Sequence, residues 1–474
     1  MYLGIDLGTS SIKAILLKGD MLIEERMEYP AELAGKTEQN PLELENVFIA
    51  FIGSLKTKYD LLRSVLRGIC LCGHGPSILF CDSSARPLTS LLTWEDRRAE
   101  KEAEEIRRSF ETFRGDATSY EAKVLWFYRR MPHLFNGENK ILYLKDYLVF
   151  KLTGKAFMDR STASTIHFYD RRNNKWKFSE LGIPDHLFPQ TLNSWDQAGV
   201  TSTAFSSLSG LEDDIPVYAG GIDAYCEALG AGAVEPGDIV DGTGTSTCIS
   251  MCLEERENED LHVIPDRSLK IEMISSSGRS VNWILNLLSE RRENIEELDL
   301  SNPVPLLFLP YLIGERSPVW DEKAMGAIIG LTESTGRAEI IKAVLQGTAF
   351  SIKQNLELIT LNEVKVEDSV RAVGGGAVER WLELKTNVTG KIYKKMKVKD
   401  SAALGAAILA AYGKRDDDFI DIVRRSVKTE RVFYPDKKRT EQFQKLYRIY
   451  TGLYSRLKDC FHSLSDFGRN NAQT

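Results

Sequence analysis

An aspartate that closely follows two adjacent glycines is the first residue of this sequence whose type and position could serve chemistry. Asp223 lies in the stretch "YAGGIDAYCEALGAG", directly before a segment with helical periodicity. A carboxylate placed there could take the proton of a substrate hydroxyl, since phosphoryl transfer needs mainly positioning, charge neutralisation and one group that orients the nucleophile. Aspartate is also favoured as the cap of a helix. Both roles can hold at once, so Asp223 is a candidate general base in contact with substrate.

Two turns rich in glycine and hydroxyl groups are the second chemical feature. Gly-Thr-Ser stands between two apolar runs at residues 8–10 and again at residues 244–246. Glycine has no Cβ, so backbone N–H groups can approach an anion there, and hydroxyls and a lysine add further donors. Two such turns facing each other could hold a triphosphate from both sides. The candidate phosphate-binding residues are Gly8, Thr9, Ser10, Ser11, Lys13, Gly244 and Thr245.

A carboxylate precedes the first of these turns. Asp6 stands two residues before the turn glycine. Hydrated Mg²⁺ prefers carboxylate and phosphate oxygens and keeps its waters, so Asp6 is a candidate metal ligand. A carboxylate at a turn can equally cap that turn, and the spacing leaves both roles open.

A run of glycines, "GGGA" at residues 374–377, ends one expected strand and opens an expected helix. Bare backbone at this point could let a flat base lie against the chain. A tight strand–helix turn is the commoner reason for such a run, so the motif by itself carries little weight.

The stretch "LTWEDRRAE" combines an aromatic ring, acids and an arginine within one turn. This combination suits a polyol, whose C–H faces can lie on the ring while its hydroxyls meet the charges; a solvated helix start is the alternative. In "CGHGPS", the histidine is more often a satisfied polar residue than a catalyst. The candidate substrate-binding residues are Gly73, His74, Trp94, Glu95, Asp96, Arg98 and Asp223.

Composition restricts the class of protein. A chain of 474 residues exceeds what one core normally holds, so two domains are expected, and 43% hydrophobic and 27% charged residues are typical of a globular protein. A net charge of −7 gives no reason to expect a nucleic-acid or membrane partner. We see no secretory signal at the N-terminus. Seven scattered cysteines indicate reduced thiols and a cytoplasmic protein. A homodimer is left open.

The strand and helix signals predict a duplicated α/β architecture. The chain begins with the expected strands "YLGID", "IKAILL" and "MLIEERMEYP" and continues with a helical pattern at residues 41–59. The pattern "DIVDG", turn, "TCISMCL" repeats this hairpin start, with Gly242 at the position that corresponds to Asp6. We therefore expect domains at residues 1–228 and 229–474. The helix "DSAALGAAILAAYG" is suited to close packing on a neighbour, and a polar tail from Arg469 is expected to fray.

Read in order, these stretches resemble the FGGY family of carbohydrate kinases over nearly the whole chain. "GIDLGTSSIKA" and "GTGTSTC" resemble its two phosphate motifs, and "AGGIDAYCEALGAG" resembles its catalytic-aspartate block. "TWEDRRA" is similar to its sugar-binding segment, with Glu95 where asparagine is usual. "LFLPYLIGERSPVWD" and "GAIIGLTESTGRAEIIKAVLQG" resemble its C-terminal signature region, and "GGGAVERWLELKTNVTG" its adenosine segment.

The resemblance implies two actin-like ATPase domains with ribonuclease-H-like cores, α/β in class, around an interdomain catalytic cleft. The duplicated turns predict that the two domains close around ATP, since each turn alone offers half of a phosphate site. It also implies ATP, Mg²⁺ and transfer of the γ-phosphoryl group to a small sugar or polyol. By position, Asp223 would be the base, and the residues lining the nucleotide would be Gly278, Asn282, Gly375, Gly376 and Ala377.

The sequence departs from its relatives in the strand-end loop that includes "GHGPS" at residues 73–77. Xylulokinase-like members carry Met-His there after Gly-Gln, and glycerol kinases carry Arg-Glu. Gly75 and Pro76 replace both pairs, which is expected to remove bulk and hydrogen-bonding capacity from the pocket. The chain thus resembles the xylulokinase-like branch with a divergent substrate motif, and neither xylulose nor glycerol is assigned.

Two other classes of protein remain as alternatives. An actin-like or chaperone-like ATPase would use the same fold without a sugar, but it would need neither the Trp94–Arg98 type of segment nor Asp223. An inactive sugar-binding regulator would be expected to lose Asp6 or Asp223, and the sequence retains both.

Overall fold

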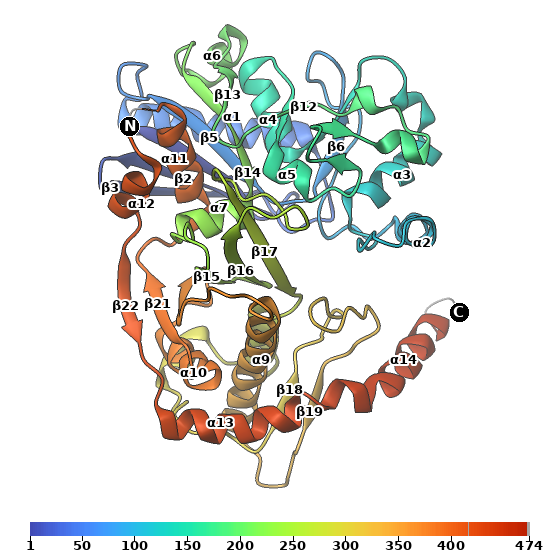
Figure 1. The fold of residues 1–474 in the computed structure, drawn as a ribbon, viewed down its shortest axis with the longest axis vertical. Coiled ribbons are helices and arrows are strands. Elements are labelled where there is room, and N and C mark those ends of the chain that lie inside the picture. The colour runs from blue at the N-terminus through green and yellow to red at the C-terminus, as the bar shows by residue number, and fades with distance from the viewer. Residues whose placement is uncertain (416, 472–474) are drawn as a thin grey trace. The chain divides into compact units, whose positions relative to one another are not determined.

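The structure is a computed structural model that describes residues 1–415 and 417–471, and it divides into two compact units (Figure 1). The first unit comprises Met1–Gly230 together with two later segments, Glu255–Ser268 and Asp400–Ser426. The second comprises Ala231–Glu254, Leu269–Lys399 and the chain from Val427 onward. The chain therefore returns twice to the first unit after leaving it.

The central sheet of the first unit has the strand order β13-β14-β5-β1-β2-β3. Strand β1 pairs antiparallel with β2 and parallel with β5, β5 pairs parallel with β14, and β13 is an antiparallel edge. The three opening strands predicted from the sequence are confirmed. The bounds are β1 Tyr2–Leu7, β2 Ser11–Lys18, β3 Met21–Glu28, β5 Gly68–Gly73, β13 Gln197–Val200 and β14 Pro216–Ile222.

The central sheet of the second unit repeats this arrangement, with the order β17-β16-β15-β20-β21-β22. Again an antiparallel hairpin, β15 and β16, is followed by two parallel pairings and an antiparallel edge strand. The predicted duplication is therefore present as two sheets of matching order. The bounds are β15 Ile239–Thr243, β16 Thr247–Glu254, β17 Arg267–Ile274, β20 Ser369–Val373, β21 Ile392–Met396 and β22 Thr429–Phe433.

Other helices and short strands complete the two units. Those of the first unit are α1 Pro41–Tyr59, α2 Glu100–Ser109, α3 Tyr120–Arg130, α4 Leu144–Thr153, α5 Arg160–Ser164, α6 Thr203–Ser209, α7 Asp223–Gly230, α11 Ser401–Gly413, α12 Phe419–Ser426, the sheet β4-β7-β6-β8 (Glu38–Gln39, Leu91–Leu92, Ile78–Cys81, Lys140–Tyr143) and the pairs β9 Phe157–Asp159 with β12 Gln190–Leu192 and β10 Tyr169–Asp170 with β11 Lys175–Trp176. Those of the second are α8 Gly278–Leu287, α9 Arg337–Ile359, α10 Glu379–Thr389, α13 Lys437–Tyr450, α14 Leu453–Asn471, β18 Leu307–Leu309 and β19 Ala327–Ile329. The tail expected to fray from Arg469 is helical to the end of α14, and residues 472–474 lie outside the described part.

Helix α11 is built for close backbone contact, as its small residues predict. A Cβ on Gly4 of β1 would lie 2.0 Å from the carbonyl oxygen of Ala403. A Cβ on Gly405 would lie 1.9 Å from the carbonyl oxygen of Cys226 in α7. The helix therefore lies directly against the two elements, β1 and α7, on which Asp6 and Asp223 are found.

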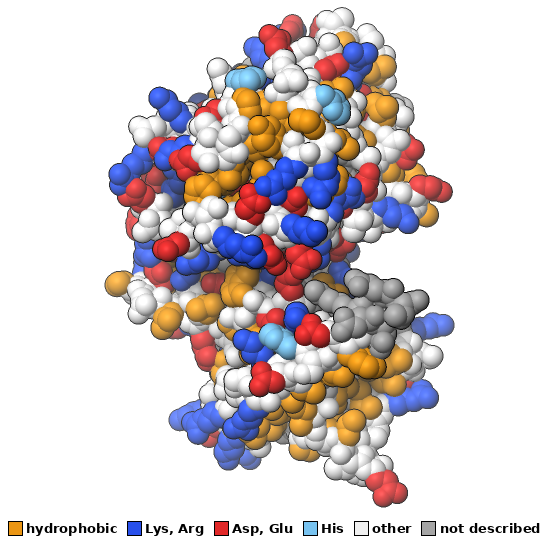
Figure 2. All heavy atoms as spheres, turned by 90° about the vertical axis from the view of Figure 1, so that its right-hand side faces the viewer, with side chains coloured by type: hydrophobic (Ala, Val, Ile, Leu, Met, Phe, Trp, Pro, Cys, Tyr) orange, Lys and Arg blue, Asp and Glu red, His pale blue; other side chains and the backbone are white. Residues whose placement is uncertain are grey.

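The surface is that of a protein with mixed charges. Figure 2 shows basic and acidic side chains interspersed over the face drawn there. Among the described residues, no helix combines the length and the apolar character that a membrane span requires.

Candidate active site

A bulge at the end of β14 places Asp223. The pairing of β14 with β5 shifts its register between Tyr218 and Gly221. Gly220 within this shift has φ +77°, and a Cβ there would lie 1.8 Å from the carbonyl oxygen of Leu71, so only glycine is tolerated. The strand then ends at Ile222 and α7 begins at Asp223, whose side chain accepts a hydrogen bond from the N–H of Ala224 at 2.7 Å.

Asp6 lies on β1, opposite Lys13 on β2. The Nζ of Lys13 lies 3.2 Å from Oδ2 of Asp6 and 3.5 Å from Oδ1 of Asp400, the residue before α11. These two carboxylates, Asp6 foremost, raise the pKa of Lys13 despite its burial. Lys13 is therefore held as a fixed positive charge beside the first turn.

Asp223 is a half-buried carboxylate with a raised pKa. Burial, and then the negative charge of Asp6, raise its pKa to about 6, while the N–H of Ala224 and the charge of Lys13 act in the opposite direction. A carboxylate with a pKa just below neutrality is ionised at neutral pH and still basic enough to accept a proton, which suits a general base.

The first turn is held by the segment that follows β3. Its own closure is a hydrogen bond from Gly8 N to Ser11 O at 3.0 Å. The carbonyl oxygens of Thr9 and Ser10 accept from Gly35 N at 3.2 Å and Tyr29 N at 2.9 Å. The turn conformation is therefore fixed by neighbouring backbone, with Ser10 exposed and Ser11 buried.

In the second unit, the second turn contacts both of the other predicted nucleotide segments. A Cβ on Gly278, the first residue of α8, would lie 2.2 Å from the carbonyl oxygen of Gly244. In the glycine run, Gly376 N donates to Thr243 O at 2.7 Å, next to Gly375 and Ala377. The structure thus brings together Gly244, Thr245, Gly278, Gly375, Gly376 and Ala377, and it places Asn282 one helical turn along α8 with its side chain exposed.

A buried lysine that sequence reasoning missed supports this arrangement. Lys385 on α10 donates to Oδ2 of Asp241 at 2.8 Å and to Oγ1 of Thr243 at 2.9 Å, just before the second turn. Its only signal in the sequence is a lysine that follows the tryptophan and the leucines of "WLELKTNV". Because Thr243 also contacts the glycine run, Lys385 helps to fix the turn and that run together.

The expected sugar segment lies beside the first turn. The indole Nε1 of Trp94 donates to Oγ1 of Thr9 at 3.3 Å, across 85 residues of sequence. Asp96 is buried and accepts from N and Nε of Arg98 at 3.0 and 2.9 Å, and Arg98 also reaches Glu38. Glu95 is half-buried between them. Helix α2 begins only at Glu100, so these side chains belong to a loop.

The strand-end loop is joined to the sugar segment through Ser77. Its Oγ accepts from Trp94 N at 2.9 Å and lies 2.5 Å from Nδ1 of His74. Burial, and then the charge of Lys123, lower the pKa of His74 to about 4, so the ring is neutral. Its buried Nε2 has no hydrogen-bond partner among the described residues, and Gly73 before it ends β5.

The space beside Gly75 in the strand-end loop is occupied by an aromatic ring. A Cβ on Gly75 would lie 2.7 Å from Cε1 of Tyr143 and 3.5 Å from Cδ1 of Ile222. The ring of Tyr143 is buried and stacks on Tyr120, with centroids 5.3 Å apart. Tyr143, a residue remote in sequence, therefore occupies the space beside Gly75. The loss of bulk and hydrogen-bonding capacity from the substrate pocket stays a prediction.

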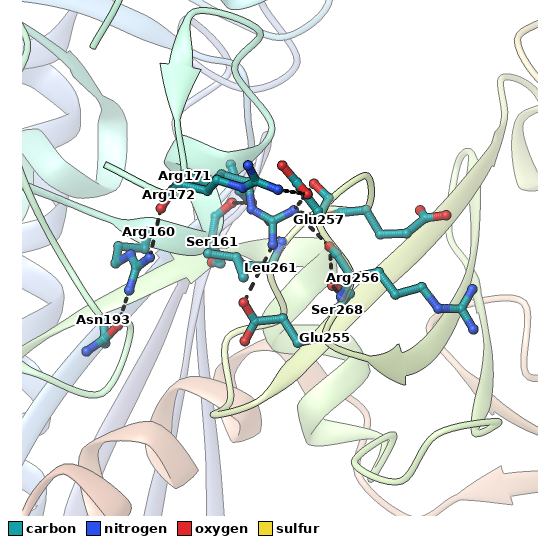
Figure 3. A network of polar contacts seen from close by, with 12 residues as sticks. Arg160, Ser161, Arg171, Arg172, Asn193, Glu255, Arg256, Glu257, Leu261 and Ser268 are labelled. Carbon is teal, nitrogen blue, oxygen red and sulfur yellow. Dashed lines mark hydrogen bonds and ion pairs between the residues drawn. The ribbon is translucent and has the colours of Figure 1, made fainter. Parts of the chain in front are cut away.

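The segment Glu255–Ser268 connects β16 to β17 but packs within the first unit (Figure 3). Arg171 donates to the carbonyl oxygens of Arg256 and Glu257 at 3.1 and 2.9 Å. Figure 3 shows the side chain of Arg172 reaching Glu257 beside it. Arg171 thus holds the segment at its backbone, and Arg172 holds it at the side chain of Glu257.

The same segment is joined to α7. Tyr225, two residues after Asp223, donates to Oδ2 of Asp260 at 2.7 Å. Burial raises the pKa of Asp260 to about 6. The helix that carries the candidate base is therefore anchored both by α11 and by this returning segment.

Comparison with known proteins places the chain in a family. The profile of the N-terminal domain of the FGGY family of carbohydrate kinases matches residues 1–230, and that of its C-terminal domain matches residues 243–413. A xylulose kinase of Staphylococcus epidermidis (strain ATCC 12228 / FDA PCI 1200) is 28% identical, with 97% of each chain covered.

Solved structures share the fold. The ligand-bound xylulose kinase of Lactobacillus acidophilus has a TM-score of 0.88 at 22% identity, covering 98% of this chain and 99% of its own. The gluconate kinase of the same organism has a TM-score of 0.87, also at 22% identity and with the same coverage. The two family profiles, which together match most of the chain, show that this chain belongs to the FGGY family of carbohydrate kinases.

Proposed function

We propose that this carbohydrate kinase transfers the γ-phosphoryl group of ATP to a hydroxyl of a small sugar or polyol, with Asp223 as the general base. The observation that carries the proposal is the half-buried Asp223 with a pKa of about 6, next to Asp6 and Lys13. Asp223 accepts the proton of the attacking hydroxyl and orients its oxygen. Family membership favours this activity over a sugar-independent ATPase or an inactive regulator.

The two Gly-Thr-Ser turns are proposed to bind the phosphates of ATP, with Lys13 adding positive charge to the first. Close approach of backbone at Gly244 and Gly278, together with the glycine run, supports a nucleotide site in the second unit. The adenosine is assigned to Gly278, Asn282, Gly375, Gly376 and Ala377, and the triphosphate to the turns.

Asp6 is proposed to bind Mg²⁺. The carboxylate is buried at the end of β1, immediately before the first turn, which fits a single protein ligand next to nucleotide phosphates. The described residues contain no group of three or more His, Cys, Asp or Glu able to hold a metal, so the remaining ligands would be phosphate oxygens and water. When bound, Mg²⁺ would neutralise charge on the transferred phosphoryl group.

Activity is expected to fall below about pH 6. Protonated Asp223 is unable to accept the proton of the hydroxyl, so kcat/KM should decrease about tenfold per pH unit on the acidic side. The check is a pH profile of kcat/KM from pH 5 to 8, with the melting temperature followed over the same range to exclude unfolding. A profile that stays flat down to pH 5 in folded enzyme would contradict the assignment.

The substrate is proposed to be a pentulose or a polyol. Xylulose and gluconate kinases stand among the relatives, yet this chain lacks the Met-His pair of the xylulokinase-like branch. Its loop presents instead the neutral ring of His74, and the wall at Gly75 is formed by Tyr143. A site that pairs a substrate hydroxyl rejects analogues that leave its polar groups unmatched, and a site without those groups should not select the same sugar.

We therefore expect D-xylulose and glycerol to be poor substrates. The measurement is ADP release with ketopentoses, pentitols, tetritols, glycerol, deoxysugars and D-gluconate. ATP turnover should depend strictly on an added sugar or polyol, as it would not in an actin-like ATPase. The lower end of ordinary enzyme efficiencies is a kcat/KM of about 10⁴ M⁻¹s⁻¹. A higher value for D-xylulose or glycerol would show that the absence of the Met-His and Arg-Glu pairs does not determine substrate selection.

A further inference from the structure

Lys123 is a fully buried lysine that the proposed reaction does not use. It lies on α3, and its side chain is 0% exposed. Lysine is almost never fully buried unless its ammonium group is bonded, because removing the charge from water is costly. Its presence inside the apolar stretch "KVLWFY" therefore calls for a specific set of contacts.

Those contacts are two backbone carbonyl groups. The Nζ of Lys123 donates to Pro76 O at 2.9 Å and to Thr93 O at 2.6 Å. Pro76 belongs to the strand-end loop with His74, and Thr93 directly precedes Trp94. One amine thus joins the two loops that supply the candidate sugar-binding side chains.

A second connection runs parallel to the first. Ser77 accepts from Trp94 N and bonds the ring of His74, so the same two loops meet at a side chain of their own. Lys123 adds a contact to both loops from outside them, from α3. Burial lowers the pKa of Lys123 to about 7, while Asp96 and Asp116 raise it and Arg98 lowers it further. Both the ammonium and the neutral amine can donate to carbonyl oxygens.

We propose that Lys123 is a positioning residue for the sugar pocket: it sets the spacing between the His74 loop and the Trp94 loop, and so acts on sugar affinity and selectivity. The inference rests on the proposed function, which assigns both loops to the sugar. The carbonyl groups that Lys123 bonds belong to Pro76 and Thr93, which are not assigned to phosphate transfer. Trp94 also bonds Thr9 of the first turn, so the loss of Lys123 should act first on the sugar and much less on ATP and the chemical step.

The test is steady-state kinetics of Lys123→Met. The probe is the member of a panel of D-xylulose, D-ribulose, ribitol, erythritol, glycerol and D-gluconate that the wild-type enzyme turns over fastest. Misplacement of binding groups by about 1 Å can cost up to about a hundredfold. We expect the KM for that sugar to rise about ten- to a hundredfold, with KM for ATP and kcat within about threefold of wild type.

Lys353→Met is the matched control. Lys353 on α9 is also a buried lysine that donates to a backbone carbonyl, Val388 O at 3.0 Å, but it lies in the second unit. Lys353→Met should lower the melting temperature without changing the KM for the sugar. Lys123→Gln, which keeps an amide donor, serves if the methionine variant does not fold, and it should recover part of the sugar affinity relative to Lys123→Met if both fold.

Trp94→Ala and Asp96→Ala distinguish the positioning role of Lys123 from the assignment of the two loops to the sugar. If both raise the sugar KM and folded Lys123→Met or Lys123→Gln does not, the positioning role is overturned and the sugar site stands. If neither raises it, the assignment of these loops to the sugar is itself wrong. An equal rise in KM for ATP and for sugar in the Lys123 variants would also overturn the inference, since it would indicate general loosening.

Discussion

Asp223→Asn is expected to lower kcat by about a hundred- to ten-thousand-fold while the protein folds and binds ATP. Loss of a general base typically has an effect of this size. Asparagine keeps the shape of the side chain and an oxygen that can accept from Ala224 N, so the start of α7 should be preserved. The measurement is ADP release at saturating sugar and ATP, with ATP affinity determined by equilibrium binding.

The stability of this variant provides the folding control. Because the pKa of Asp223 is about 6 in the folded protein and 3.8 as its ordinary value, the folded state binds its proton more tightly than the unfolded state. Ionisation of Asp223 therefore destabilises the wild-type fold progressively as pH rises from about 4 to 6. At about 1.4 kcal/mol per pKa unit, asparagine should raise the free energy of unfolding at pH 7.5 by up to about 3 kcal/mol, and by less at pH 5. If Asp223→Asn keeps a kcat near that of wild type, Asp223 is only a helix cap and is not the general base.

Gly405→Ala is expected to destabilise the first unit by about 2 kcal/mol, the steric cost less the helix propensity that alanine gains. The new Cβ would lie 1.9 Å from the carbonyl oxygen of Cys226 and 2.7 Å from its carbonyl carbon, and both are backbone atoms that a rotamer change does not move. Helices α11 and α7 would have to separate, which costs about 1–3 kcal/mol or more in a packed core. Alanine is intrinsically favoured over glycine in a helix by about 1 kcal/mol. A lower free energy of unfolding in Gly405→Ala would therefore come from the steric clash and not from helix propensity.

Gly468→Ala is the matched control for this prediction. Gly468 lies in α14, and a Cβ there would have nothing within 4 Å. The same substitution should therefore be neutral or stabilise by up to about 1 kcal/mol. Denaturant unfolding of both variants compares them directly. Equal stability of the two would show that α11 and α7 are not in backbone contact at Gly405.

Local chemistry made much of this protein predictable. The Gly-Thr-Ser turns, the hairpin strands around them and the small-residue helix are encoded in short stretches, because glycine placement, β-branched runs and residue size act over a few residues. The order of such stretches along the chain carried the family resemblance. The duplication followed from the same signals, and the two sheets have matching strand order.

Contacts between distant residues were decided only by the tertiary structure. The bond from Trp94 to Thr9, the ring of Tyr143 against Gly75 and the two carbonyl bonds of Lys123 each join segments tens of residues apart. A hydrophobic pattern tells which face of a helix is buried, and it does not tell which atoms meet that face.

The pKa values of the charged residues likewise depend on contacts that the sequence does not reveal. The sequence by itself made Asp6, Lys13 and Asp223 candidates through their positions next to turns and a helix start. The raised pKa of Asp223 required its burial and the nearby charge of Asp6, which only the folding of β14, β1 and α11 against one another provides. Residue type and local spacing therefore determined what chemistry was available, and long-range packing decided which groups act together, because electrostatic coupling and desolvation depend on distance in space and not along the chain.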